Sequence, residues 1–172
     1  TGVAAPVLPT AADIILIGGQ DDVTIPQGYD AGAVSVTVSD DGTTSCNLFI
    51  GDGTTTNAAA TLTLSGDITL NSNGVVRVGG TTNTGTRTSS LSVVNMILNG
   101  TSTFTIGNTG NVTNTASISG DLTLNVGTTA NVGGNGGSTN NLNLAGNLAN
   151  SGTINYTATA DVVNFNLTGT GS

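Results

Sequence analysis

The chain repeats one short segment at a fixed interval. The string SGDITLN at residues 65–71 returns as SGDLTLN at residues 119–125, and a looser version, AGNLAN, occupies residues 145–150, half an interval further on. Self-similarity at a fixed period is typical of proteins built by stacking one structural unit on the next. The repeat therefore predicts an architecture of stacked units, each in contact mainly with its neighbours.

Between the copies, short pairs of apolar residues are separated by one polar residue, and Gly, Asn or Asp follows closely. This alternation is typical of short strands bounded by turns. From residue 62 onward the pairs fall into triplets. The triplets are Leu62/Leu64, Ile68/Leu70 and Val76/Val78; Leu91/Val93, Met96/Leu98 and Phe104/Ile106; Ala116/Ile118, Leu122/Leu124 and Ala130/Val132; and Leu142/Leu144, Leu148 and Ile154/Tyr156. A fifth triplet begins at Phe165/Leu167.

Each triplet has the length of one coil of a solenoid. The equivalent positions Leu64, Val93, Ile118, Leu144 and Leu167 are 29, 25, 26 and 23 residues apart by subtraction. Three short strands with three turns need about that many residues. We therefore expect an all-β fold, a single-stranded parallel β-helix (β-solenoid), right-handed, with three strands per coil of 23–29 residues. We expect both apolar residues of each pair to point inward and the polar residue between them to point outward.

We expect one continuous domain with two parts. Residues 1–60 contain all three prolines and are less regular, which predicts lead-in or cap strands and the first coils; residues 61–172 form the regular coils. The glycines Gly66, Gly120, Gly146 and Gly169 recur at one phase of the repeat. We interpret them as structural corners that need positive φ, which glycine adopts most readily.

Charge excludes several classes of partner. The net charge is -8, and Arg77 and Arg87 are the only cations. Nucleic acids and anionic membrane surfaces require clustered Lys and Arg, so neither is expected as a partner. No apolar run approaches the roughly 18 residues of a membrane span, so we expect no membrane insertion. Because the chain starts at Thr1 without a charged and apolar leader, we expect a secretion signal that has been removed.

The residue types needed for catalysis are scarce. The chain has no His, Lys or Glu, which removes the usual general bases and activators of nucleophiles, so we expect no catalytic residues and no enzyme. The single cysteine, Cys46, lies in a strand-like run and is interpreted as a small buried side chain, with a disulfide link between subunits as the alternative. We expect no cofactor, with calcium left open because seven of the ten Asp residues lie at or before residue 52. The candidate calcium ligands are Asp21, Asp22, Asp40, Asp41 and Asp52, although solvated turns explain these acids more simply.

Four strings carry a resemblance to a known group of proteins. They are PTAAD at residues 9–13, DDVTIPQG at 21–28, NLFIG at 47–51 and LTLSGDITL at 62–70. Together they resemble the parallel β-helix modules of secreted bacterial surface proteins and adhesins. The resemblance implies an extracellular, cell-surface protein that is not an enzyme and that serves as a stalk, an adhesin or a fibre subunit.

The ends of the predicted stack suggest how such a protein is used. Residues 162–169 supply the first strand of a coil, which leaves an open sheet edge that invites another chain. The apolar N-terminal residues 3–17 could pair with that edge or cover it. We expect a structural subunit of an extracellular bacterial filament or surface layer, with copies of itself joined head to tail. The expected interface residues are Val3, Pro6, Leu8, Ile14, Ile15, Leu16, Ile17, Val163, Phe165 and Leu167.

Two alternatives keep the same fold. The first is a monomeric adhesin or glycan-binding module of a larger surface protein, whose partner is a surface polysaccharide. The second, less favoured, is a polysaccharide lyase or hydrolase that uses the paired acids Asp40 and Asp41, although no cation accompanies them.

Overall fold

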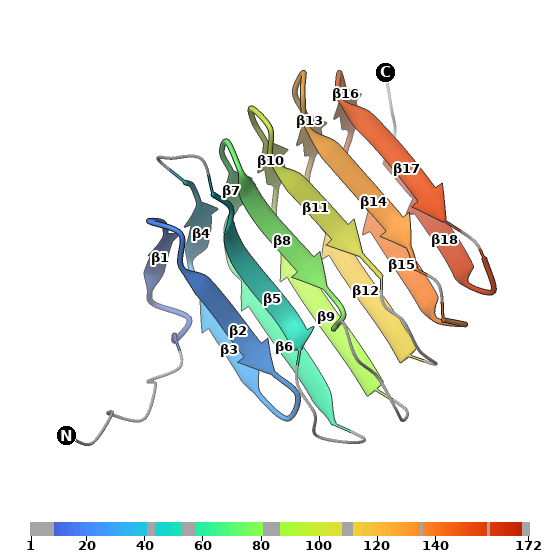
Figure 1. Cartoon of the computed structure of the whole chain (residues 1–172), viewed down its shortest axis with the longest axis horizontal. Helices are drawn as coiled ribbons and strands as arrows, with labels where there is room; N and C mark the ends of the chain where they lie inside the picture. Colours follow the sequence, from blue (N-terminus) through green and yellow to red (C-terminus); the bar gives the residue numbers. More distant parts are fainter. Residues whose placement is uncertain are drawn as a thin grey trace.

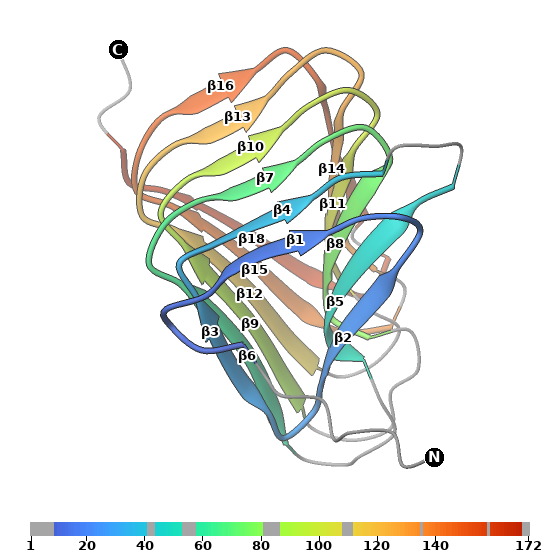
Figure 2. The same ribbon diagram turned by 90° about the vertical axis from the view of Figure 1, so that its left-hand side faces the viewer.

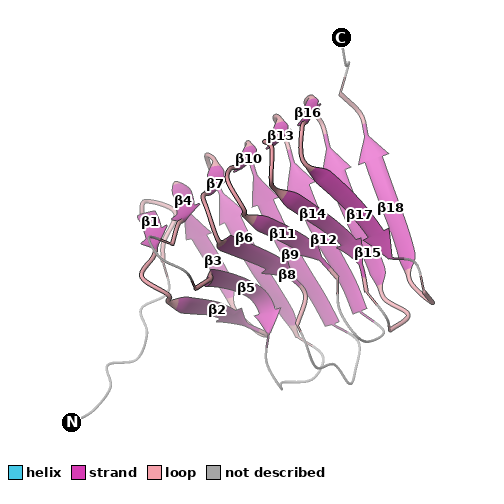
Figure 3. Ribbon diagram, turned by 45° about the horizontal axis from the view of Figure 1, so that its top comes forward, coloured by secondary structure: helices cyan, strands magenta, loops and turns pink. Residues whose placement is uncertain are grey.

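The computed structural model of the chain is a β-solenoid built from three parallel sheets (Figure 1). It describes residues 9–40, 44–52, 58–80, 87–107, 112–134, 136–157 and 159–169, with the side chain of residue 52 excepted. Within these ranges every regular element is a strand (Figure 3). No helix of the described chain is long and apolar enough to cross a membrane.

The strands follow one another around three faces in strict rotation. The first sheet has the order β1-β4-β7-β10-β13-β16, the second β17-β14-β11-β8-β5-β2, and the third β18-β15-β12-β9-β6-β3; we name these sheets A, B and C. Figure 2 shows the three sheets surrounding the axis of the solenoid. We call the space inside them, which side chains fill, the bore. The strands are β1 (Ile14–Ile17), β2 (Asp22–Pro26), β3 (Asp30–Ala33), β4 (Ser35–Val38), β5 (Cys46–Asp52), β6 (Ala59–Leu64), β7 (Ile68–Leu70), β8 (Gly74–Val78), β9 (Arg87–Val93), β10 (Met96–Leu98), β11 (Thr103–Ile106), β12 (Val112–Ile118), β13 (Leu122–Leu124), β14 (Thr129–Gly133), β15 (Thr139–Leu144), β16 (Leu148–Asn150), β17 (Thr153–Thr157) and β18 (Val162–Leu167).

The register confirms the predicted fold and spacing. In sheet C, Val93 pairs with Ile118, Ile118 with Leu144, and Leu144 with Leu167. The two near-identical segments contribute β7 and β13, which are separated by β10, so one copy of the sequence repeat spans two coils. Paired positions in sheet A show that the first coil is 21 residues long and the second 32, by subtraction. Despite these lengths, their strands occupy the same three sheets.

The bore is filled by the inward members of each alternating pair. In the middle coils these side chains are almost completely buried, and each lies over the equivalent side chain of the next coil. Large and small residues compensate for each other along a column: Phe104 lies over Ala130 in sheet B, and Leu91 over Ala116 in sheet C. Such compensation keeps the core close-packed although individual coils differ in side-chain volume.

The corner glycines are present for a different reason from the one expected. Gly66, Gly120 and Gly146 lie in bends between sheets C and A, and Gly169 lies in the bend after β18. None of the four has a backbone in the positive-φ region. Instead, a Cβ atom there would collide with the coil below; at Gly66 it would lie 2.8 Å from the carbonyl oxygen of Val34. These glycines allow close coil-to-coil approach at this corner.

Positive φ occurs at another corner of the coil. Gly51, Gly79 and Gly133, each at the end of its sheet B strand, have φ of 91°, 112° and 116°. They occupy equivalent positions in their coils and redirect the chain into the longer connections that lead to sheet C. Glycine is needed here because L side chains rarely adopt this conformation.

Polar side chains form ladders on the outside of the stack. At the corner between sheets C and A, the Oδ1 atom of Asp67 accepts hydrogen bonds from the backbone N–H (3.1 Å) and Nδ2 (2.8 Å) of Asn95. Asn95 Oδ1 accepts from the N–H of Asp121 (2.8 Å), and Asp121 Oδ1 accepts from the N–H of Asn147 (2.8 Å). The ladder ties four successive coils together.

Asparagine amides build similar ladders at other phases. After sheet A, Asn99 donates to Asn71 (3.1 Å) and Asn125 donates to Asn99 (2.7 Å). On the outer face of sheet C, Asn166 donates to Asn143 (2.7 Å). Each amide connects one coil to the previous one, so the ladders add side-chain hydrogen bonds to those of the backbone.

Candidate functional site

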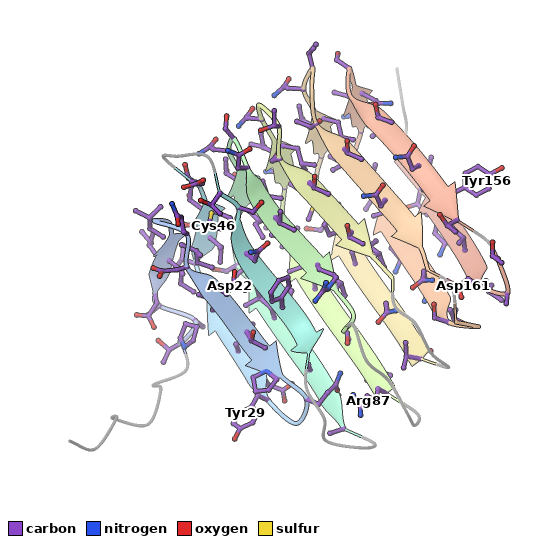
Figure 4. All side chains as sticks on the ribbon, in the orientation of Figure 1. Asp22, Tyr29, Cys46, Arg87, Tyr156 and Asp161 are labelled. Atoms are coloured by element: carbon purple, nitrogen blue, oxygen red, sulfur yellow. The ribbon has the colours of Figure 1, made fainter. Side chains whose placement is uncertain are left out.

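The C-terminal end of the stack exposes side chains that are buried in every inner coil. The inward residues of the last coil, among them Tyr156, Phe165 and Leu167, are 72%, 40% and 56% exposed. Their partners in the coil below are almost completely buried. Figure 4 shows Tyr156 projecting beyond the last coil. Within the described chain, β16, β17 and β18 each have a strand on one side only, so this end presents an uncovered section through the core.

The N-terminal end contains a hollow of about 510 Å³. It opens beneath the first coil and reaches the core residues of the second. Its walls are mostly aliphatic, and Pro9, Asp13 and Thr24 also line it. The aliphatic residues that line it are Ile14, Ile15, Leu16, Ile17, Val23, Ile25, Val36, Leu48 and Leu62. The two ends of the solenoid therefore differ: one is hollow, and the other carries exposed aromatic side chains.

The predicted interface residues lie at these two ends, as far as the structure describes them. In β1, Ile15 and Ile17 point into the bore, whereas Ile14 and Leu16 point outward and are 78% and 75% exposed. In β18, Val163, Phe165 and Leu167 occupy the inward column. Val3, Pro6 and Leu8 lie outside the described residues. Whether these residues contact another copy stays a prediction.

The predicted calcium ligands are spread over separate turns. Asp21 and Asp22 lie at the start of β2, where Asp22 Oδ1 accepts a hydrogen bond from Asn47 (2.5 Å). Asp40 follows β4 and is buried. Residue 41 and the side chain of residue 52 lie outside the described part of the chain. Among the residues that the structure describes, no group of three or more His, Cys, Asp or Glu side chains could hold a metal ion.

Cys46 occupies a buried position at the start of β5. Its Sγ atom lies 3.7 Å from the carbonyl oxygen of Ile17, as a weak donor. Burial, followed by the negative charge of Asp40, raises the pKa of the thiol. A buried thiol with a raised pKa is poorly nucleophilic, so Cys46 serves as a core side chain.

Asp161 is the polar centre that sequence reasoning missed. Its carboxylate, between β17 and β18, accepts hydrogen bonds from the backbone N–H groups of Gly134, Gly136 (3.2 Å) and Ser138 (2.8 Å). It also accepts from Ser138 Oγ (3.0 Å) and Asn140 Nδ2 (3.2 Å). Burial alone would raise the pKa of Asp161, but the hydrogen bonds from Ser138, Gly134 and Gly136 outweigh it and lower the pKa. The last coil thereby holds the loop of the coil before it.

The outer face of sheet C is uncharged and mostly polar from β6 to β18, with Ala59 and Val162 as apolar exceptions. Hydroxyl and amide side chains occupy its outward columns, including Ser92, Ser117, Asn143 and Asn166. These four residues line a shallow groove of about 360 Å³ on the side toward sheet A, and Ile118, Leu144 and Ala145 also line it. The groove crosses several coils along the solenoid axis.

The fold defines the class of this protein as a β-solenoid of three parallel sheets. No family model, no curated protein and no solved structure matches the chain. The structure confirms the predicted solenoid architecture. The link to bacterial surface proteins and adhesins rests on sequence resemblance alone.

Proposed function

We propose that this chain is a non-catalytic structural subunit of an extracellular bacterial filament or surface layer, and that copies join head to tail through their end coils. The observation that carries the proposal is the uncovered core section at the C-terminal end. Exposed apolar core residues and unpaired strand edges are the features that natural sheets use for pairing with another chain.

Other features of the fold suit a load-bearing role. The polar ladders connect successive coils from the outside. The bore of the middle coils is packed mostly with apolar side chains, and Ser89, Asn114 and Asn140 form a buried polar column within it. A head-to-tail contact is heterologous, and such contacts give open filaments when the rotation does not close a ring. A solenoid that stacks coil on coil would extend along its own axis.

Electron microscopy of the purified chain tests this proposal. Six coils at about 4.8 Å each predict fibres with an axial repeat of roughly 30 Å per subunit. Sedimentation over a wide range of concentrations provides the second measurement. A chain that stays monomeric at every concentration, with no fibres on the grid, would show that the proposal is wrong.

The groove on sheet C favours one second candidate, a glycan-binding module. Hydroxyl and amide groups in a neutral groove are suited to hydrogen bonds with the hydroxyl groups of a neutral linear polysaccharide. Calorimetry with neutral and with uronate polysaccharides tests this candidate. Asn143→Ala should weaken the binding of a neutral chain, whereas Asn155→Ala on sheet B serves as the matched control and should not. Equal binding by both variants would refute the groove as the site.

A further inference from the structure

Residues 9–13 lie along the outer edge of β3, the first strand of sheet C. The backbone N–H of Gly32 donates to the carbonyl oxygen of Pro9 (3.3 Å), and the N–H of Val34 donates to that of Asp13 (2.7 Å). A Cβ atom built on Gly32 would lie 3.7 Å from the Cβ of Ala11. The segment therefore occupies the place where the preceding coil would run.

A compact turn keeps this segment in shape. The carboxylate of Asp13 accepts hydrogen bonds from the backbone N–H (2.7 Å) and the hydroxyl (3.0 Å) of Thr10, and the N–H of Asp13 donates back to the Thr10 carbonyl (3.0 Å). These bonds lower the pKa of Asp13. Residues 10–13 are nonetheless exposed to solvent. The turn thus fixes the shape of the segment, but two backbone hydrogen bonds join it to β3 and the residue that follows, and little of it is buried.

The covered edge is also where the next subunit would pair. Within the stack, Ala33, Leu64, Val93, Ile118, Leu144 and Leu167 form one column of sheet C. Continuing that register across two copies places Leu167 of one copy over Ala33 of the next, and Phe165 over Ala31. Large residues over alanine repeat the pairing seen inside the core, where Phe104 lies over Ala130. A second copy cannot take this place while residues 9–13 occupy it.

The distribution of acidic residues favours contact between an N-terminal and a C-terminal end over contact between two N-terminal ends. Asp13, Asp21, Asp22 and Asp30 all lie in or next to the first coil, whereas the last coil contains one acid, Asp161, whose carboxylate is occupied by its own loop. Two N-terminal ends would bring like charges together, which disfavours that arrangement. An N-terminal end facing a C-terminal end avoids this repulsion, so the occupant that fits the N-terminal hollow is the last coil of another copy.

We propose that residues 9–13 are an intramolecular cover, which β18 of the next copy displaces when subunits join. This inference rests on the proposed head-to-tail assembly and adds its regulation: a free subunit shields its sheet C edge, and the incoming coil must release it. The aromatic side chains at the C-terminal end then enter the hollow beneath the cover. Displacement makes joining slower than simple end-to-end contact.

A disulfide that pins the cover tests the inference. The Cβ separation of 3.7 Å between Ala11 and a Cβ built at Gly32 is within the range for a disulfide. The variant Ala11→Cys/Gly32→Cys is made in a Cys46→Ala background, and Gly32→Cys alone in the same background is the control. Assembly is followed by light scattering and electron microscopy, oxidised and then after reduction. We expect the oxidised double variant to assemble about tenfold more slowly or not at all, and reduction to restore the rate.

The outcomes separate this inference from the proposal on which it depends. If the oxidised and reduced forms assemble equally fast, the cover is refuted while head-to-tail assembly stands. If the unaltered chain never assembles, both are refuted. A second variant, Asp13→Ala, removes the turn and is expected to shorten the lag before assembly by several-fold. An unchanged or longer lag would contradict the role given to residues 9–13, whatever the folding yield of the cysteine variant.

Discussion

Replacing Asp161 by asparagine should weaken the C-terminal part of the stack. In Asp161→Asn, one side-chain oxygen remains for the N–H groups of Gly136 and Ser138, but the other becomes an NH2 group. That group would face three donors, the N–H of Gly134, the hydroxyl of Ser138 and the amide of Asn140. The hydroxyl can rotate and accept from the new NH2 group, but the other two donors cannot. Two donors lose their acceptor at about 1–1.5 kcal/mol each, so we expect about 2–3 kcal/mol of destabilisation.

The same variant should change how stability depends on pH. The hydrogen bonds lower the pKa of Asp161 below its ordinary value of 3.8. A carboxyl whose pKa is lower in the folded than in the unfolded chain contributes its full stabilisation at pH values above the pKa of the unfolded chain. This stabilisation is lost as the pH falls through the pKa of the folded chain. The native chain should therefore lose stability as the pH falls below about 4. Asp161→Asn should show a smaller loss over the same range.

Amide hydrogen exchange at Gly134 and Ser138 is the most direct assay. Solenoid coils can open locally at an end, so a global unfolding curve can hide a local effect. Urea titrations at pH 7 and pH 3 give the pH dependence. Asp67→Asn is the matched control because asparagine already fills the equivalent position at Asn95 and Asn147, and we expect it to cost under about 0.5 kcal/mol. Equal protection factors in Asp161→Asn and the native chain would refute the reasoning.

Three further predictions concern the core, the corners and the ladders. Phe165→Ala should cost under about 1 kcal/mol in the monomer yet weaken assembly, whereas the buried Phe104→Ala should cost about 3–5 kcal/mol; urea unfolding and sedimentation separate the two effects. Gly146→Ala should destabilise by about 1–3 kcal/mol because its Cβ would collide with the Gly120 carbonyl, and near-native thermal stability would contradict the packing argument. Asn99→Ala, which interrupts an amide ladder, should cost about 1 kcal/mol by urea titration.

The fold could be predicted because its causes are local in the sequence. Alternating apolar pairs such as Leu122 and Leu124 indicate which side chains face the bore, and the spacing between the pairs indicates the length of a coil. Both signals recur from residue 62 onward, although Leu148 stands alone in place of a pair in the fourth triplet. Because the pattern is repeated, an irregularity in one coil does not obscure the alignment of the others. The predicted alignment of Val93, Ile118, Leu144 and Leu167 therefore agrees with the observed strand pairing.

The reason for the corner glycines could not be read from the residue type. Glycine is compatible with positive φ and equally with a close approach of two backbones. Gly66 and Gly146 show the close approach alone, whereas Gly79 and Gly133 combine positive φ with a close approach to the next coil. The equivalent corner position is filled by Val94 in one coil, a departure that argues against a strict need for positive φ at that phase.

The candidate site was only partly predictable. Exposure of Phe165 and Leu167 follows from their place in the last coil, which the sequence spacing indicates. The hollow, the Asp161 centre and the cover depend on how irregular segments fold back on the stack, and no periodic signal describes such segments. The amide ladders could have been found, because Asn71, Asn99 and Asn125 recur at one phase of the repeat.

The ladder of Asp67, Asn95, Asp121 and Asn147 alternates a charged residue with a neutral one. Adjacent rungs lie about 4.8 Å apart, so successive carboxylates are separated by about 9.6 Å, slightly more than the screening length of roughly 8 Å at physiological salt. Each asparagine also supplies a donor that aspartate lacks. Two coils are the smallest segment whose duplication preserves both the spacing of the carboxylates and the amide donor between them. Lengthening the protein by single coils would either place two carboxylates side by side or leave the alternation broken.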